Sequence, residues 1–116
     1  MKRTNQISIK NLQFQPVVGV YSHERVGGQV IEIDVTLEYT RPGLEDDVAT
    51  TIDYDEIVSG IEKYLAEHKP YLIETIGEAV LDVCFSFSSV HAASAVIRKP
   101  KALRNGLASI TVSRNR

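Results

Sequence analysis

The chain has 116 residues, of which 43% are hydrophobic and 24% are charged, so its composition is globular and excludes the disordered and fibrous classes. Thirteen basic and fifteen acidic side chains give a net charge of −2, which excludes a general nucleic-acid-binding protein. A run of about 18 apolar residues is absent, so we expect no transmembrane helix and no membrane partner. The length predicts one domain that spans residues 1–116.

The cysteine and histidine content bears on location and on metals. A single cysteine, Cys84, cannot form an intramolecular disulfide, and residues 1–6 are too polar for the core of a signal peptide. Both observations favour a reducing, cytoplasmic location. The three histidines are scattered without ligand spacing, so we expect no metal site.

The hydrophobic pattern predicts four strands and two helices in the order ββααββ. The expected elements span residues 7–14, 29–39, 54–68, 70–87, 92–99 and 107–113. Apolar and polar residues alternate in the strands, most clearly in the second, whereas the helices carry apolar residues at helical spacing. Because strands stand at both ends of the chain with helices between them, this order favours an α+β fold with an antiparallel four-stranded sheet covered on one face.

Turn and capping residues set the expected boundaries. Asp53 and Glu56 have the spacing of a capping box at the start of the first helix, and Pro70 suits the first turn of the second. The pair Asn105-Gly106 indicates a two-residue hairpin turn before the last strand, with a longer loop as the alternative.

The edges of such a small sheet predict self-association. Four strands leave two exposed edges, and exposed edges pair with identical neighbours. A closed ring of sheets would remove those edges, and the acidic outer face of the second strand must meet water or another subunit. We therefore expect a homo-oligomer, a prediction that sedimentation as a monomer at micromolar concentration would contradict.

Four polar residues near the ends of predicted elements have both a structural and a functional interpretation. Glu24 is a solvated loop charge or a functional carboxylate, and Tyr54 is a packing tyrosine or a functional hydroxyl. Glu74, in the first turn of the second helix, complements the helix dipole or anchors a ligand beside a partner chain. Lys99 belongs to a basic run over residues 98–104 that protects a sheet edge or binds an anionic group.

Several motifs taken together resemble the dihydroneopterin aldolase family and the related dihydroneopterin triphosphate epimerase. They are Gly19-Val20 with Glu24-Arg25, Gln29, Asp46-Asp47-Val48, Thr51-Ile52-Asp53-Tyr54, Leu72-Ile73-Glu74-Thr75, Lys99-Pro100-Lys101-Ala102, and the closing strand over 110–114. The motifs follow the family's order across nearly the whole chain. The resemblance implies the tunnel fold (T-fold), in which ββααββ subunits join their sheets into an oligomeric β-barrel, commonly a tetrameric ring or an octamer of two rings.

The activity that the resemblance implies is a step of folate biosynthesis. A lyase of this family cleaves 7,8-dihydroneopterin by a retro-aldol reaction into 6-hydroxymethyl-7,8-dihydropterin and glycolaldehyde, and it can also epimerise the substrate at the 2′ carbon. The C=N bond of the dihydropterin accepts the electrons, so the resemblance implies no cofactor, no metal and no Schiff base. The implied partners are the small-molecule pterin and further copies of the chain, with active sites between subunits.

The resemblance also implies roles for individual residues. Lys99 matches the family's catalytic lysine, Tyr54 the tyrosine that protonates the intermediate, and Glu24 the glutamate that orders the lysine and a water molecule. Glu74 matches the glutamate that accepts two neighbouring N–H donors of the pterin, while backbone groups near Ile73 and Tyr54 bind the rest of the ring edge. Glu24 and Tyr54 thus belong to both the catalytic and the substrate-binding sets.

Other functions remain open at this point. The Ala102-Leu103-Arg104 segment is similar to the epimerase branch, in which the basic run would meet a triphosphate, whereas Lys99-Pro100 favours the aldolase. Arg98 and Lys101 are candidate cationic neighbours that would destabilise the Lys99 ammonium. The alternatives are a dihydroneopterin triphosphate 2′-epimerase, a non-catalytic pterin- or purine-binding oligomer, and a structural oligomer without a ligand.

Overall fold

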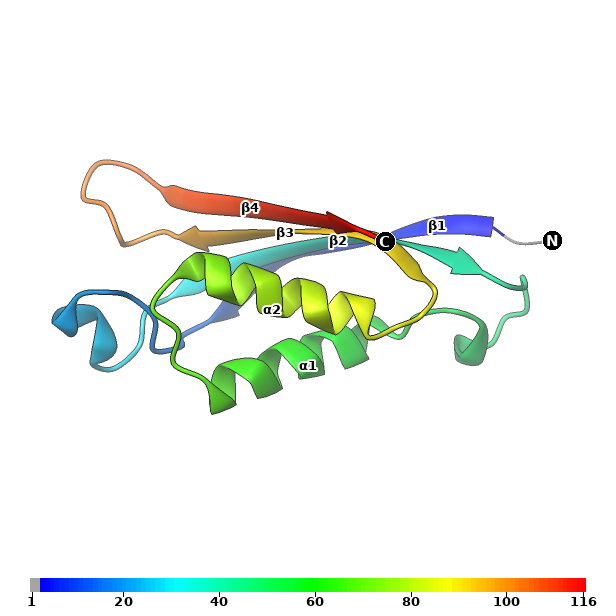
Figure 1. Ribbon diagram of the computed structural model, residues 1–116, viewed down its shortest axis with the longest axis horizontal. Helices are drawn as coiled ribbons and strands as arrows, with labels where there is room; N and C mark the ends of the chain where they lie inside the picture. Colours follow the sequence, from blue (N-terminus) through cyan, green and yellow to red (C-terminus); the bar gives the residue numbers. More distant parts are fainter. Residues whose placement is uncertain (1–2) are drawn as a thin grey trace.

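The computed structural model describes residues 3–116, so Met1 and Lys2 of the polar opening segment lie outside the described residues. The chain has the expected ββααββ order (Figure 1). Its elements are β1 Arg3–Phe14, the 3₁₀ turn η1 Ser22–Arg25, β2 Ile31–Arg41, the 3₁₀ turn η2 Val48–Thr50, α1 Tyr54–Glu67, α2 Ile73–Phe85, β3 Val90–Lys99 and β4 Ala108–Asn115.

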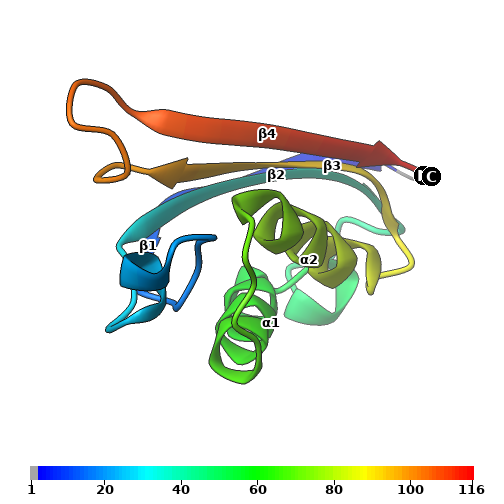
Figure 2. The same cartoon turned by 60° about the vertical axis from the view of Figure 1, so that its left-hand side comes forward.

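The four strands form one antiparallel sheet in the order β1-β2-β3-β4, and both helices lie on the same face of it (Figure 2). Alternate side chains of β2 point to the helices and are buried, as period-two alternation requires. The core lies between sheet and helices. Its largest fully buried side chains are Ile31, Ile33, Leu37, Ile57, Ile61, Ile76, Leu81 and Ile97. The predicted antiparallel sheet with one covered face is therefore confirmed.

The start of α2 differs from the prediction. The helix begins at Ile73, so Pro70 lies outside it and the expectation that Pro70 occupies its first turn was wrong. Leu72 is the N-cap residue, in an extended conformation with φ of −118°. The carbonyl oxygen of Pro70 instead accepts hydrogen bonds from the loop that follows β1. The linker between the helices is therefore anchored to a distant segment of the chain.

The connection from β3 to β4 is a loop over residues 100–107 and not a two-residue turn. The ladder between the strands ends where Lys99 faces Ala108, and the next residue, Pro100, has no N–H group to extend it. The longer of the two expected loops is therefore correct, and Asn105-Gly106 lies within it. This loop overhangs the end of the sheet at which β3 stops (Figure 1).

An ion cluster on the open face of the sheet joins three strands. Arg98 of β3 donates to both carboxylate oxygens of Asp34, at 2.8 and 3.0 Å, and to Glu32 at 3.1 Å. The backbone N–H of Asn11, at the irregularity in β1, also donates to Asp34 at 2.9 Å. The hydrogen bonds from Arg98 lower the pKa of Asp34 from 3.8 to about 2. The carboxylate thus ties β1 and β3 to the central strand.

Replacing Asp34 by asparagine is expected to lower the free energy of unfolding at pH 7 by about 1–3 kcal/mol, because charge-assisted bonds to Arg98 are lost. The pKa is depressed in the folded state, so this stabilisation is complete above about pH 4 and disappears as the pH falls toward 2. Urea unfolding of wild type and Asp34→Asn across this range measures the difference, with Asp46→Asn in an exposed loop as control. A difference that stays constant down to pH 2 would contradict the assignment.

Candidate active site

A groove of about 520 Å³ lies at the end of the molecule where β3 stops, between η1, the first turn of α2 and the 100–107 loop. These segments come together at the left of Figure 1 although they are far apart in the sequence. Four of the five predicted site residues line the groove: Glu24, Ile73, Glu74 and Lys99. The fold thus brings together residues from η1, α2 and β3.

Glu24 and Lys99 form the central contact of the site. The Lys99 ammonium donates to the Glu24 carboxylate at 2.7 Å, and the two side chains are only 14% and 11% exposed. The carboxylate also accepts from the Gln29 amide at 3.1 Å and from the Tyr21 backbone N–H at 3.2 Å. The hydrogen bond from Lys99 is the main cause that lowers the pKa of Glu24 to about 2. The interpretation of these two residues as solvated charges was wrong.

A glycine makes room for the Glu24 side chain. Gly19 has a φ of +132°, and a Cβ atom at this position would lie 2.5 Å from the Cβ and Cδ atoms of Glu24. Any larger residue would therefore push the carboxylate away from Lys99, in addition to the backbone strain of the positive φ. This explains why a glycine stands five residues before the glutamate.

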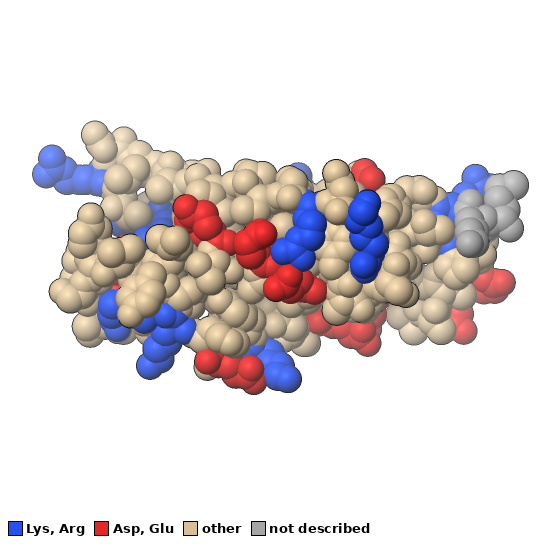
Figure 3. All heavy atoms as spheres, in the orientation of Figure 1, with Lys and Arg blue, Asp and Glu red and all other residues tan. Residues whose placement is uncertain are grey.

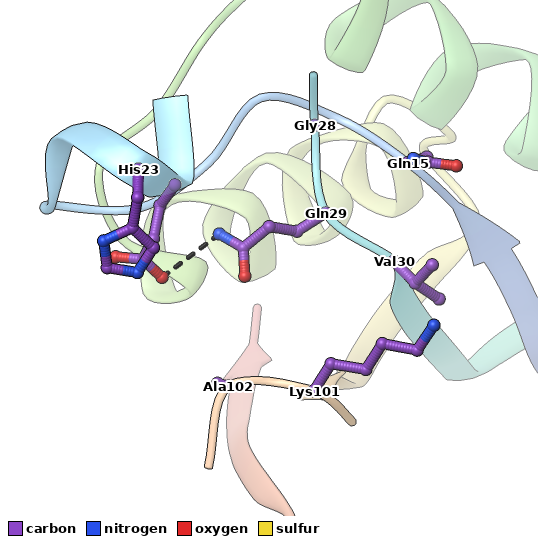
Figure 4. A pocket seen from close by; sticks show the side chains of 8 residues that line it. Gln15, His23, Gly28, Gln29, Val30, Lys101 and Ala102 are labelled. Carbon is purple, nitrogen blue, oxygen red and sulfur yellow. Dashed lines mark hydrogen bonds between the residues drawn. The ribbon is translucent and has the colours of Figure 1, made fainter. Parts of the chain in front are cut away.

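Gln29 supports Glu24 from the segment just before β2, and the sequence interpretation assigned it no role. Its amide nitrogen donates to the Glu24 carboxylate, as the dashed line in Figure 4 shows, and to the carbonyl oxygen of Val18. The available signal was its position, directly after the glycine turn and before the strand whose apolar residues face the core. A polar side chain there must find a partner in the neighbouring loop.

The Lys99 ammonium has N–H groups free to bind a ligand. One of the two cationic side chains expected near it, that of Arg98, lies elsewhere. Within residues 3–116 the ammonium donates to Glu24 alone, so two of its three N–H groups remain. Arg98, expected as a cationic neighbour, points to the opposite face because successive strand residues alternate, and it binds Glu32 and Asp34 there. That expectation was wrong. Lys101, the other expected neighbour, lines a second cavity that Glu24 also lines.

This second cavity, of about 320 Å³, adjoins Glu24. Figure 4 shows the Gln29 amide pointing toward His23, and the Lys101 side chain extending across the cavity toward Val30. The cavity shares His23 and Glu24 with the groove, so the two spaces meet at the Glu24–Lys99 pair. Its polar lining suits the hydroxyl or phosphate groups of a ligand whose ring lies in the groove.

Ile73 and Glu74 form the start of α2, at the other wall of the groove. Ile73 is buried and directs its side chain to the core, so its backbone contributes to the groove. Glu74 is exposed, in the first turn, where free N–H groups and the helix dipole favour a carboxylate. The groove therefore presents N–H donors and an acceptor carboxylate side by side, which suits a flat polar ring.

Tyr54 is the one predicted site residue that the fold keeps away from the others. It begins α1, whose 14 residues span about 21 Å and run toward the groove, so Tyr54 lies at the opposite end of the helix (Figure 1). Its side chain is 59% exposed, and the interpretation as a packing tyrosine was wrong. Leu44 and Val48, in the preceding loop, are also exposed. Three large side chains with apolar atoms are therefore exposed in α1 and the loop before it.

The described residues offer neither a cluster of metal ligands nor a membrane-spanning helix. Within residues 3–116, no three His, Cys, Asp or Glu side chains gather as metal ligands would. Neither described helix has the length and apolarity that a bilayer crossing requires.

The chemistry that the site can perform with its own residues is proton transfer by a lysine that is hydrogen-bonded to a carboxylate, beside a second carboxylate that can accept hydrogen bonds.

Comparison with known proteins identifies the family. The family model for dihydroneopterin aldolase (FolB) matches residues 7–114, nearly the whole chain. The chain belongs to the dihydroneopterin aldolase family. The chain is similar to proteins that carry the names of both enzymes, and the range that the family model matches contains Glu24, Tyr54, Ile73, Glu74 and Lys99.

Individual relatives of the family cover most of the chain. A dihydroneopterin aldolase from Streptomyces coelicolor is 27% identical over 100 residues, or 84% of each chain. A dihydroneopterin triphosphate 2′-epimerase from Escherichia coli is 28% identical over 100 residues, 84% of this chain and 83% of its own. The crystal structure of the Burkholderia thailandensis dihydroneopterin aldolase bound to guanine superposes with a TM-score of 0.85 at 20% identity, covering 97% of this chain and 92% of that one. The fold is therefore that of the family.

Proposed function

We propose that this protein is a dihydroneopterin aldolase, a lyase that cleaves 7,8-dihydroneopterin into 6-hydroxymethyl-7,8-dihydropterin and glycolaldehyde. The observation that carries the proposal is the 2.7 Å contact between Lys99 and Glu24 in a groove that also contains Glu74. A retro-aldol cleavage of a pterin needs groups that transfer protons and a group that holds the ring. The Lys99–Glu24 pair can supply the first and the Glu74 carboxylate the second. Family membership over residues 7–114 supports the same conclusion.

In this proposal the pterin ring binds at the start of α2. A pterin has an amino group and a neighbouring ring N–H, and the Glu74 carboxylate can accept a hydrogen bond from each. Backbone groups of Ile73 bind the adjoining edge of the ring. Guanine, the ligand of the Burkholderia relative, has the same pair of neighbouring donors. With the ring in the groove, its side chain reaches the Glu24–Lys99 pair, where the groove meets the second cavity.

The reaction moves protons and needs no oxidant. Loss of the 2′-hydroxyl proton turns that oxygen into the aldehyde of glycolaldehyde while the bond between C1′ and C2′ breaks. The released electron pair moves into the C=N bond of the ring, and the ring nitrogen takes up a proton. Protonation of C1′ and loss of the nitrogen proton then give the hydroxymethyl product. Lys99, held by Glu24, exchanges the first protons, and Tyr54 delivers the proton to carbon. The mechanism requires neither a metal nor a Schiff base.

The tyrosine in this scheme comes from another copy of the chain. Within one chain α1 separates Tyr54 from the groove by about 21 Å, which exceeds the reach of any side chain. β1 and β4 are the edge strands of the sheet, and pairing between copies would close a β-barrel without free edges. A cyclic homo-oligomer, as a tetramer or an octamer of two rings, brings the exposed Tyr54 end of one subunit to the groove of its neighbour.

A product assay tests the proposal. Purified protein is incubated with 7,8-dihydroneopterin or with its triphosphate, and glycolaldehyde and the pterin products are quantified. We expect glycolaldehyde from the unphosphorylated substrate at a rate well above that without protein. Binding of pterins without product would contradict the enzyme and favour a binding protein, and the absence of binding would favour a structural oligomer.

A second function, the 2′-epimerisation of dihydroneopterin triphosphate, follows from one observation. Lys101 and His23 line the cavity that adjoins Glu24, where the tail of a substrate would lie, and the Lys101 ammonium suits phosphate groups. Epimerisation would use the same cleavage, followed by recombination of the two fragments with the opposite configuration at C2′. A strong preference for the triphosphate in the product assay, with epimer and not aldehyde as product, would identify this function.

Replacing Gly19 by alanine is expected to reduce kcat about tenfold or more, because the new Cβ atom displaces Glu24 from Lys99. The control is Gly27→Ala in the same loop. Gly27 also has a positive φ, of +76°, but a Cβ atom there meets nothing within 4 Å. Both variants place alanine at a positive φ, with more strain expected at +132° than at +76°, so kcat is compared only for variants that fold like wild type. Equal losses of kcat in the two folded variants would contradict the positioning of Glu24 by Gly19.

A further inference from the structure

Arg25 links two segments that are distant in the sequence. Its Nη1 atom donates to the carbonyl oxygens of Pro70 at 2.8 Å and Gly19 at 3.3 Å, and its Nη2 atom donates to that of Lys69 at 2.8 Å. The guanidinium carbon also lies 4.3 Å from the centre of the Tyr71 ring. One side chain from η1 therefore contacts three consecutive residues of the linker between α1 and α2.

These contacts depend on the shape of arginine. The planar guanidinium presents several N–H donors in a fixed fork and stacks on an aromatic ring, whereas a lysine ammonium is a flexible point charge. The ion pairs found within residues 3–116 do not include Arg25, so its charge acts on carbonyl oxygens and on the Tyr71 ring. Its exposure is intermediate, unlike that of a solubilising surface charge.

The segments that Arg25 joins carry the two parts of the site. Glu24 directly precedes it in η1, and Glu74 stands three residues after Tyr71, in the first turn of α2. The N-cap residue of α2, Leu72, makes no side-chain hydrogen bond that would fix the start of the helix. Arg25, together with a hydrogen bond of 3.4 Å from the Gly19 N–H to the Pro70 carbonyl, holds that linker from outside.

We propose that Arg25 is a positioning residue, which sets the placement of the Glu74 ring anchor relative to the Glu24–Lys99 pair. The inference rests on the proposed function for its catalytic consequence, although the structural link is independent of it. A ring held by Glu74 reacts only if its side chain meets Lys99, and small misplacements of reacting groups cost large factors in rate. Loss of the guanidinium fork therefore lowers kcat, whereas the contacts that bind the ring remain.

The test compares Arg25→Lys with a matched variant at the other end of α2. Arg116 makes the same kind of contact: its guanidinium donates to the carbonyl oxygens of Phe85 and Val90 and lies 5.0 Å from the Phe85 ring centre. We expect Arg25→Lys to lower kcat about 10- to 100-fold with KM within about threefold of wild type. Arg116→Lys should lower the melting temperature by a similar amount and leave kcat unchanged. Tyr71→Leu, which keeps the fork, should produce a smaller loss of kcat.

Hydrogen exchange provides a readout that requires no substrate. In Arg25→Lys we expect faster amide exchange in residues 19–25 and 69–75 and unchanged exchange elsewhere, because the link between these segments is local. Unchanged exchange in them, or a uniform increase like that of a globally destabilised protein, would overturn the proposal. So would a kcat within twofold of wild type. If the wild type cleaves no dihydroneopterin, the proposed function fails, and the exchange pattern still decides the role of Arg25.

Discussion

Replacing Lys99 by alanine is expected to lower kcat for glycolaldehyde release by about 100-fold or more, the scale of a lost proton-transfer group. The ammonium of Lys99 contacts Glu24 at 2.7 Å and lines the groove, so the same substitution removes the proton carrier and the partner of the carboxylate. The loss should appear in kcat, since the ring anchor at the start of α2 remains intact.

Three measurements test this prediction. Without Lys99, Glu24 is a partly buried charge without its cation, which lowers stability. The variant is therefore first shown to be folded by eluting from a size-exclusion column at the wild-type volume. Lys63→Ala, on the exposed surface of α1, is the matched control and should leave kcat unchanged. Turnover of a folded Lys99→Ala protein within tenfold of wild type would remove Lys99 from the mechanism.

Replacing Glu74 by glutamine is expected to lower kcat/KM by about 100-fold, mainly through a higher KM. In the proposed complex the carboxylate accepts two charge-assisted hydrogen bonds from the pterin, whereas the amide would offer a single oxygen and oppose one N–H donor with another. Since Glu74 is exposed and in the first turn of α2, the substitution should cost only about 0.3–1 kcal/mol of stability through the helix dipole.

The control for this variant lies one turn further along α2. Glu78 is also exposed, and its carboxylate contacts Arg114 at 3.4 Å, away from the groove. Glu78→Gln should change neither KM nor kcat. Pterin affinity measured by calorimetry separates the two interpretations of Glu74: equal affinities of Glu74→Gln and wild type would leave it as a surface residue that complements the helix dipole.

The element order was predictable because its signals are local. Period-two alternation in β2 and helical spacing in α1 depend on neighbouring residues only, and the structure confirms both elements to within about two residues at each end, the usual disagreement between methods. Local signals also led to the errors. Pro70 was compatible with a first helical turn, but contacts from η1 hold it in the linker. Asn105-Gly106 suits a tight turn, but Pro100 ends the ladder before it.

The site was less predictable, because its central contact joins residues 75 positions apart. No pattern in the sequence pairs Glu24 with Lys99: their positions near element ends made each a candidate, and only the family resemblance gave them linked roles. The orientation of Arg98 shows the same limit, since alternation places it on the face opposite Lys99 only once the strand is known to extend through both. The contacts of Arg25 and Gln29 are likewise long-range or loop-based, so sequence interpretation assigned neither a role.

The most direct test is a mixture of two inactive variants, Lys99→Ala and Tyr54→Phe. They are co-expressed with different tags and purified through both, so that each oligomer contains the two kinds of chain. If one chain supplies Lys99 and its neighbour Tyr54, random assembly leaves about a quarter of the sites with both residues. We expect the mixed oligomers to release glycolaldehyde at about a quarter of the wild-type rate. A rate no higher than that of the separate variants would contradict a site shared between chains.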